Sequence, residues 1–203
     1  MKNKTAPAVG CVIMAAGNAV RFGENKLATF LDGKPLIEHA FTAVPTDSIT
    51  SVCVVTQYDE VEELAKRYGF QCVHNDRPED GLSRTVRLGT EALCDTCSAI
   101  LYLVSDQPLL KRESVAALIG CYRKHPDAIV SASHDGKRGN PCIFPKKYFP
   151  ELCALTGDTG GSAVIRRHES DLLLFEVGEE ELTDVDTKAI LEKLNEQTAS
   201  DRR

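Results

Sequence analysis

Residues 9–17 read VGCVIMAAG, an apolar run that ends in three small residues. The run at 9–14 is typical of a β-strand that is buried on both faces, as strands are in parallel sheets. Small residues directly after such a strand let a ligand approach the backbone closely. The stretch therefore predicts an α/β protein with a binding loop at the end of its first strand.

Strand-like and helix-like segments alternate along the rest of the chain. Further strands are predicted at residues 51–56, 70–74, 99–104, 128–131, 141–144 and 172–177. Helices are predicted at residues 35–44, 59–68, 82–93, 112–122, 148–155, 161–168 and 187–196, with a frayed tail at 197–203. This alternation favours a mostly parallel sheet with helices on both faces, in which ligands bind beyond the carboxyl ends of the strands.

The composition is that of an ordinary globular chain, and it excludes several classes of protein. A length of 203 residues favours one domain over residues 1–203. Lysine and arginine number 24 against 30 acidic residues, and this net charge of −6 argues against a general nucleic-acid binder. No apolar run approaches the ~18 residues that span a bilayer, and no secretory signal is visible. We expect a cytoplasmic protein with neither nucleic-acid nor membrane partners.

The chain has eight cysteines, of which only Cys94 and Cys97 lie close together. A zinc site needs a second pair, or histidines at ligand spacing, and neither is present. We therefore expect these two cysteines to mark a helix end in a reducing compartment. Metal binding or redox chemistry at the pair is the less favoured alternative.

The loop after the first strand carries two cations, Arg21 and Lys26. Backbone N–H groups together with two cations can hold a polyphosphate. The spacing from Gly17 to Gly23 fits neither the Walker loop nor the dinucleotide fingerprint. The alternative interpretation is a surface loop with two solvated charges.

Carboxylates follow two later segments of the pattern. Asp106 comes directly after the strand at 99–104, where it can hold Mg²⁺ or serve as an ordinary turn residue. Asp184 and Asp186 alternate, so an extended backbone would point both the same way, as a second metal ligand requires. Asp186 can alternatively cap the helix that follows.

Taken together, these elements closely resemble the MobA-like nucleotidyltransferases, and within them the molybdenum cofactor cytidylyltransferases. The opening motifs are AAG at 15–17, Arg21, Gly23, NKL at 25–27 and GKPL at 33–36. The later motifs are GLSRT at 81–85, SDQP at 105–108, GNP at 139–141, GDTG at 157–160 and DVDT at 184–187. The resemblance implies a three-layer α/β/α, Rossmann-like fold of the nucleotide-diphospho-sugar transferase type.

The resemblance also implies an activity and a set of site residues. The family joins a nucleoside triphosphate to a phosphorylated acceptor and releases pyrophosphate. By this resemblance the catalytic residues are Arg21, Lys26 and Asp106, and those that bind the nucleotide are Ala15, Ala16, Gly17, Arg21, Lys26, Gly81, Thr85 and Asp106. The acceptor would meet Asn140 and Asp158, and Mg²⁺ would be held by Asp106 and Asp186, with Asp184 a weaker candidate.

Ala16 bears on the choice of base. Guanylyl-transferring relatives typically have Ala-Gly-Gly where this chain has AAG at 15–17. The methyl group of Ala16 would crowd a purine, so the resemblance favours CTP. The implied acceptor is the molybdenum pterin cofactor, with a molybdenum hydroxylase as the recipient of the product.

Two other functions stay open. Cytidylyltransferases that act on methylerythritol phosphate carry His-Asp-x-x-Arg-Pro where this chain has SDQP at 105–108, which places that substrate, or another sugar or alcohol phosphate, second. The other alternative is a carrier that binds the pterin cofactor without catalysis. The presence of Lys26, Asp106 and Asp186 together favours the enzyme.

Overall fold

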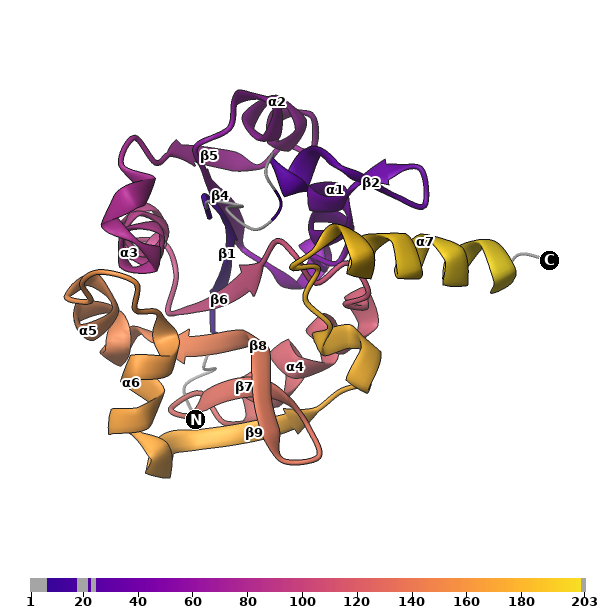
Figure 1. Cartoon of the computed structure of the whole chain (residues 1–203). Helices are drawn as coiled ribbons and strands as arrows, with labels where there is room; N and C mark the ends of the chain where they lie inside the picture. Colours follow the sequence, from indigo (N-terminus) through magenta and orange to yellow (C-terminus); the bar gives the residue numbers. More distant parts are fainter. Residues whose placement is uncertain (1–6, 18–21, 23–24, 202–203) are drawn as a thin grey trace.

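A single seven-stranded sheet runs through the centre of the molecule (Figure 1). The computed structural model describes residues 7–17, 22 and 25–201. The strand order is β5-β4-β1-β6-β8-β7-β9. The strands are β1 (Val9–Ala15), β4 (Ser51–Thr56), β5 (Gln71–His74), β6 (Ala99–Val104), β7 (Ile129–His134), β8 (Lys137–Pro145) and β9 (Leu172–Glu176). A separate two-stranded ribbon joins β2 (Phe30–Leu31) to β3 (Lys34–Pro35).

Helices cover both faces of the sheet, which confirms the predicted three-layer α/β fold (Figure 1). One face packs against α1 (Leu36–Thr42), α2 (Asp59–Arg67) and α4 (Arg112–Lys124). The other packs against α3 (Leu82–Leu93), α5 (Phe149–Cys153) and α6 (Gly161–Arg167). Within β1, Cys11 and Ile13 face the first layer and Val12 the second, as alternating side chains of a buried strand must. Helix α3 lies so close to Val12 that a Cβ at Gly89 would come within 2.4 Å of it.

Most strand pairs are parallel, and β8 is the exception. It pairs antiparallel with both β6 and β7, whereas β9 again runs parallel to β7. The reversal from β7 to β8 occurs at Asp135 and Gly136, which both have positive φ, as the tight turns of hairpins require. The sequence predicted a strand only at 141–144, so the first half of β8 is a finding of the structure.

The C-terminal helix corrects one expectation. Helix α7 runs from Lys188 to Asp201, so the frayed tail expected from Gln197 is helical as far as Asp201. Residues 197–201 contain neither glycine nor proline, and the Thr198 hydroxyl donates to the carbonyl of Leu194 at 2.9 Å. Within the described residues, no helix is long and apolar enough to cross a membrane.

Candidate active site

A cavity of about 850 Å³ lies at the carboxyl ends of β1 and β6. These two strands are parallel neighbours, with Met14 opposite Val104, so the loops that follow them meet at one edge of the sheet. Eight of the predicted site residues line the cavity: Ala16, Gly17, Lys26, Gly81, Thr85, Asp106, Asn140 and Asp158. The structure therefore brings together motifs that lie more than 140 positions apart in the chain.

Of the other three predicted site residues, two are described by the structure, and neither of these lines the cavity. Ala15 is fully buried in β1, where its side chain packs into the core, and its part in binding the nucleotide stays a prediction. Asp186 is half exposed and lies beside Lys26 rather than on the cavity wall. Arg21 lies outside the residues that the structure describes.

Lys26 is the centre of the charged part of the site. Its Nζ lies 2.7 Å from Asp106 Oδ2 and 3.7 Å from Asp186 Oδ1, and it also donates to the carbonyl of Val185 at 3.3 Å. The Asn25 side chain caps the short 3₁₀ helix Lys26–Ala28 by accepting from the N–H of Leu27. The Lys26 side chain is only 17% exposed, so little solvent screens these contacts.

The segment around Asp184 and Asp186 is held in place by its buried neighbours. Val185 is fully buried, and its N–H donates to the carbonyl of Asp106 at 2.8 Å. Gln107 Nε2 donates to Asp184 Oδ1 at 3.0 Å. The pKa of Asp184 is raised, first by the partial burial of its carboxyl group and then by the negative charge of Asp106. Asp106 and Asp186 thus lie beside one lysine, and Asp184 lies close enough to sense the charges of these groups.

Glu181 ties the segment that leads to Asp184 and Asp186 to the start of α4. It is 3% exposed, and its carboxylate accepts from the backbone N–H of Lys111 and the hydroxyl of Ser114, both at 3.0 Å. These two groups lie at the start of α4, where N–H groups lack partners within the helix. A residue distant in sequence therefore caps α4 and fixes the path of the chain that leads to Asp184 and Asp186.

On the opposite wall, the start of α3 meets the turn at 157–160. The N–H of Ser83 donates to the carbonyl of Gly157 at 3.2 Å, and the N–H of Leu82 donates to Asp158 Oδ1 at 3.4 Å. Thr85 is nearly buried, and its Oγ1 accepts from Asn75 Nδ2 at 3.3 Å. This wall is thus built by two motifs packed against each other, and Asp158 also caps a helix.

Residues 11–172 match the family model described as the MobA-like NTP transferase domain. The chain belongs to this family. Relatives of the chain transfer both cytidylyl and guanylyl groups, and its structural neighbours share the nucleotidyltransferase fold, so the protein is a nucleotidyltransferase.

The curated relatives of this nucleotidyltransferase differ in their substrates. Purine catabolism protein PucB of Bacillus subtilis (strain 168) is 26% identical over 190 residues, which cover 87% of this chain and 90% of that protein. A probable molybdenum cofactor guanylyltransferase of Pyrococcus horikoshii is 26% identical over 110 residues, 53% of each chain. A 3-deoxy-manno-octulosonate cytidylyltransferase of Thermodesulfovibrio yellowstonii is 27% identical, and the match spans 59% of this chain and 49% of that one.

Solved structures share the fold of this nucleotidyltransferase. A nucleotidyl transferase from Methanothermobacter thermautotroptrophicus superposes with a TM-score of 0.78 at 20% identity, covering 95% of this chain and 98% of that one. A manganese complex of Rv0371C from Mycobacterium tuberculosis H37Rv has a TM-score of 0.70 at 16% identity, covering 93% and 98% of the two chains.

Besides Glu79, sequence reasoning missed three polar residues that line the cavity: Arg138, Ser162 and Arg166. Arg138 lies in β8 beside the GNP motif, and the other two lie in α6. The one feature of the sequence that could have drawn attention to Arg138 is its position next to Gly139 of the GNP motif. The first half of β8 was not predicted as a strand, so nothing indicated that Arg138 faces this cavity.

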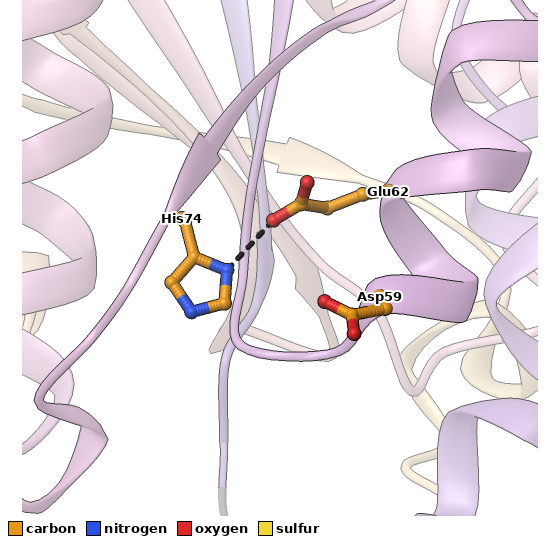
Figure 2. A group of neighbouring side chains, drawn as sticks. All are labelled: Asp59, Glu62 and His74. Carbon is orange, nitrogen blue, oxygen red and sulfur yellow. Dashed lines mark hydrogen bonds and ion pairs between the residues drawn. The ribbon is translucent and has the colours of Figure 1, made fainter.

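Two groups of potential metal ligands lie elsewhere in the described part of the chain. One is formed by Asp59, Glu62 and His74, and Figure 2 shows how α2 and β5 bring them together. His74 Nδ1 and Glu62 Oε1 lie 2.7 Å apart, a contact that ties β5 to α2. The other group is His134, Asp135 and Glu176, at the hairpin end beside β9. Neither group lines the cavity or includes the carboxylates predicted to hold Mg²⁺.

The Cys94–Cys97 pair lies at the end of α3, as expected. Cys97 is buried against Gly10, where an added Cβ would come within 2.7 Å of its Sγ. All eight cysteines are free thiols. The two groups of potential metal ligands found among the described residues contain no cysteine.

Gly81 is predicted to be indispensable to the wall formed by α3 and the 157–160 turn. Its φ is +87°, and an added Cβ would lie 2.5 Å from the backbone carbon of Gly157. We expect Gly81→Ala to lower the free energy of unfolding by about 1–3 kcal/mol through backbone strain and displacement of the turn. The matched control is Gly120→Ala in α4, where nothing lies within 4 Å of the new methyl group. Urea denaturation checks both variants, and equal midpoints would contradict the prediction.

Proposed function

We propose that this nucleotidyltransferase transfers CMP from CTP to the phosphate of the molybdenum pterin cofactor and releases pyrophosphate. The observation that carries the proposal is the close approach of Lys26 to Asp106, at 2.7 Å, beside the backbone of Ala16 and Gly17 in one cavity. Nucleotidyl transfer needs positioning and charge neutralisation rather than a covalent protein group. Positioning and charge neutralisation can be provided by a lysine, a carboxylate and an accessible backbone.

Each wall of the cavity has a part in binding the nucleotide. Gly17 and Lys26, together with Arg21, hold the triphosphate, and Lys26 neutralises charge that develops on the α-phosphate during attack. Gly81 and Thr85 line the pocket for the base on the α3 side. Ala16 is 3% exposed and lines the same cavity, so its methyl group limits the room for a larger base.

The carboxylates beside Lys26 fit a divalent cation. Asp106 and Asp186 both approach the same ammonium group, and Asp184 lies close enough to have its pKa raised by both. Such an oxygen donor set suits Mg²⁺, which favours one or two carboxylates plus phosphate oxygens. We assign Asp106 and Asp186 as its ligands, and the manganese complex of a structural relative supports a divalent ion. When bound, the ion would neutralise charge on the triphosphate.

The acceptor side of the cavity is more basic than expected. Asn140 and Asp158, proposed to contact the acceptor, share the cavity with Arg138 and Arg166. Two guanidinium groups suit an acceptor that is itself anionic, as a phosphorylated pterin is. A molybdenum hydroxylase would then receive the product. The molybdenum cofactor relative supports this acceptor, whereas other relatives act on 3-deoxy-manno-octulosonate.

Guanylyl transfer is the second candidate, because the molybdenum relative that the chain resembles is a guanylyltransferase. The base can be tested by measuring kcat/KM for CTP and for GTP with the pterin acceptor. We expect wild type to prefer CTP, and Ala16→Gly to relax the preference only partly, because one methyl group in a pocket is worth roughly 1–3 kcal/mol. A wild-type enzyme that uses GTP as well as CTP would contradict the assignment of the base.

The same assay separates the remaining alternatives. Pyrophosphate release from CTP with methylerythritol phosphate, but not with the pterin, would assign the isoprenoid substrate instead. Binding of the pterin without pyrophosphate release from either nucleotide would indicate a carrier.

A further inference from the structure

Three consecutive side chains, at the end of β4 and just beyond it, donate to three consecutive carbonyl groups at the end of β1 and just beyond it. Thr56 Oγ1 donates to the carbonyl of Ala15 at 3.0 Å, and Gln57 Nε2 donates to that of Ala16 at 2.9 Å. The hydroxyl of Tyr58 donates to the carbonyl of Gly17 at 3.1 Å. Because Ala15 and Thr56 are partners in the parallel β1–β4 ladder, these side chains continue the pairing beyond the point where the strands end.

Packing alone does not hold the end of this segment. Gly17 is exposed, and nothing lies within 4 Å of the position that a Cβ would take. Tyr58, in contrast, is partly buried and packs against the core on the α2 face of the sheet. A side chain anchored in the core therefore reaches out to the exposed glycine, and the hydrogen bond from Tyr58 is the contact that fixes its carbonyl.

Fixing a carbonyl also fixes the N–H group that follows it. In a trans peptide the C=O and N–H bonds point in opposite directions. With the carbonyl of Ala16 directed at Gln57, the N–H of Gly17 is directed away from Gln57. Likewise, the N–H of Ala16 is directed away from Thr56. Both residues line the cavity, and N–H groups held in one direction are what a phosphate-binding loop requires.

Glu60 makes a similar contact at the far end of the loop. Its Oε1 accepts from Asn25 Nδ2 at 2.7 Å, while Asn25 Oδ1 caps the 3₁₀ helix that carries Lys26. The start of α2 thus contacts both ends of the loop between β1 and Lys26. Burial, and then the charge of Glu60, raises the pKa of Tyr58, so its hydroxyl keeps the proton that it donates.

We propose that Gln57 and Tyr58 are positioning residues for the nucleotide: they hold the carbonyl groups of Ala16 and Gly17, and Gln57 thereby directs the N–H of Gly17 toward the triphosphate. The inference rests on the proposed function, in which this segment holds the triphosphate. It adds that phosphate binding depends in part on Gln57 and Tyr58, whose side chains do not line the cavity. Because the backbone that these side chains hold is proposed to bind the phosphates, their effect on nucleotide binding should be the same for every base.

The test compares Tyr58→Phe, Gln57→Met and the double variant with wild type. We expect each single variant to raise KM for CTP about three- to tenfold, the range for the loss of one net hydrogen bond, and the double variant to raise it further. The inhibition constant of inorganic pyrophosphate against CTP should rise by the same factor. KM for the acceptor should stay within about twofold, because the residues proposed to meet the acceptor, Asn140 and Asp158, do not belong to this segment.

The matched control is Tyr68→Phe. Tyr68 also donates its hydroxyl to a single acceptor, Glu38 Oε1 at 2.7 Å, and it lies at the end of the same helix away from the cavity. This control should lose as much thermal stability as Tyr58→Phe but keep its KM for CTP. If both tyrosine variants lowered Tm and left KM unchanged, Tyr58 would be a structural residue and the inference would be overturned.

The same measurements keep the inference separate from the function on which it rests. If wild type used neither CTP nor GTP, the proposed function would fail first and the inference with it. If wild type used one of them while the double variant kept its KM for that nucleotide and its affinity for pyrophosphate, the inference alone would fail.

Discussion

Lys26→Ala is expected to lower kcat about 10²–10³-fold, the loss typical of removing one electrostatic stabiliser of a transition state. The physical reason is the place of Lys26, whose Nζ lies 2.7 Å from Asp106 in a largely buried setting where charge is weakly screened. Steady-state kinetics with CTP, Mg²⁺ and the acceptor measure the effect. We expect KM for CTP to change less than kcat, because the contact strengthens as charge develops.

Two further variants make the result for Lys26 interpretable. Lys26→Met keeps most of the aliphatic chain and its packing, so it should lose kcat as Lys26→Ala does while losing less stability. Lys111→Ala is the control, because Lys111 is an exposed lysine whose partner Glu180 lies outside the cavity wall. Turnover near that of wild type in Lys26→Met would remove Lys26 from the mechanism.

Asp106→Asn is expected to abolish most activity, with a loss in kcat of at least about 10², while Tm changes little. The amide keeps the shape of the carboxylate but removes the charge that a hard cation needs. The dependence of rate on Mg²⁺ concentration is the measurement that separates a metal ligand from a turn residue. We expect half-maximal activation to move to a much higher Mg²⁺ concentration.

Neighbouring carboxylates provide the comparison. Asp186→Asn should show the same kind of Mg²⁺ defect in a weaker form, since Asp186 lies farther from Lys26 and is half exposed. Asp95→Asn, at the exposed end of α3, should behave as wild type. An Asp106→Asn protein that unfolds without any change in its response to Mg²⁺ would show that Asp106 is a structural turn residue.

The pattern of apolar residues is enough to predict the layers of this fold and the edge of the sheet at which its site lies. Continuous apolar runs at 9–14 and 99–104 are typical of strands that are buried on both faces. Amphipathic segments such as 59–68 form the helices that cover those faces. Parallel strands end at one edge, so the residues after the runs, Ala16 and Asp106, were predictable neighbours. The choice of motifs within these loops was enough to indicate the family.

Contacts between distant segments, in contrast, could not be predicted from the pattern of residues. Lys26 meets Asp106, 80 residues away, and Asp186, 160 residues away, because buried Val185 and the carboxylate of Glu181 fix the path of the chain there. Two other features could not be predicted for the same reason. One is the direction of β8, which brings Arg138 to the cavity. The other is the pair of hydrogen bonds that Gln57 and Tyr58 donate to the backbone after β1. The local spacing of apolar residues indicates which face of a helix or strand is apolar. It does not record the register and path of a chain, and these set the distances between polar side chains.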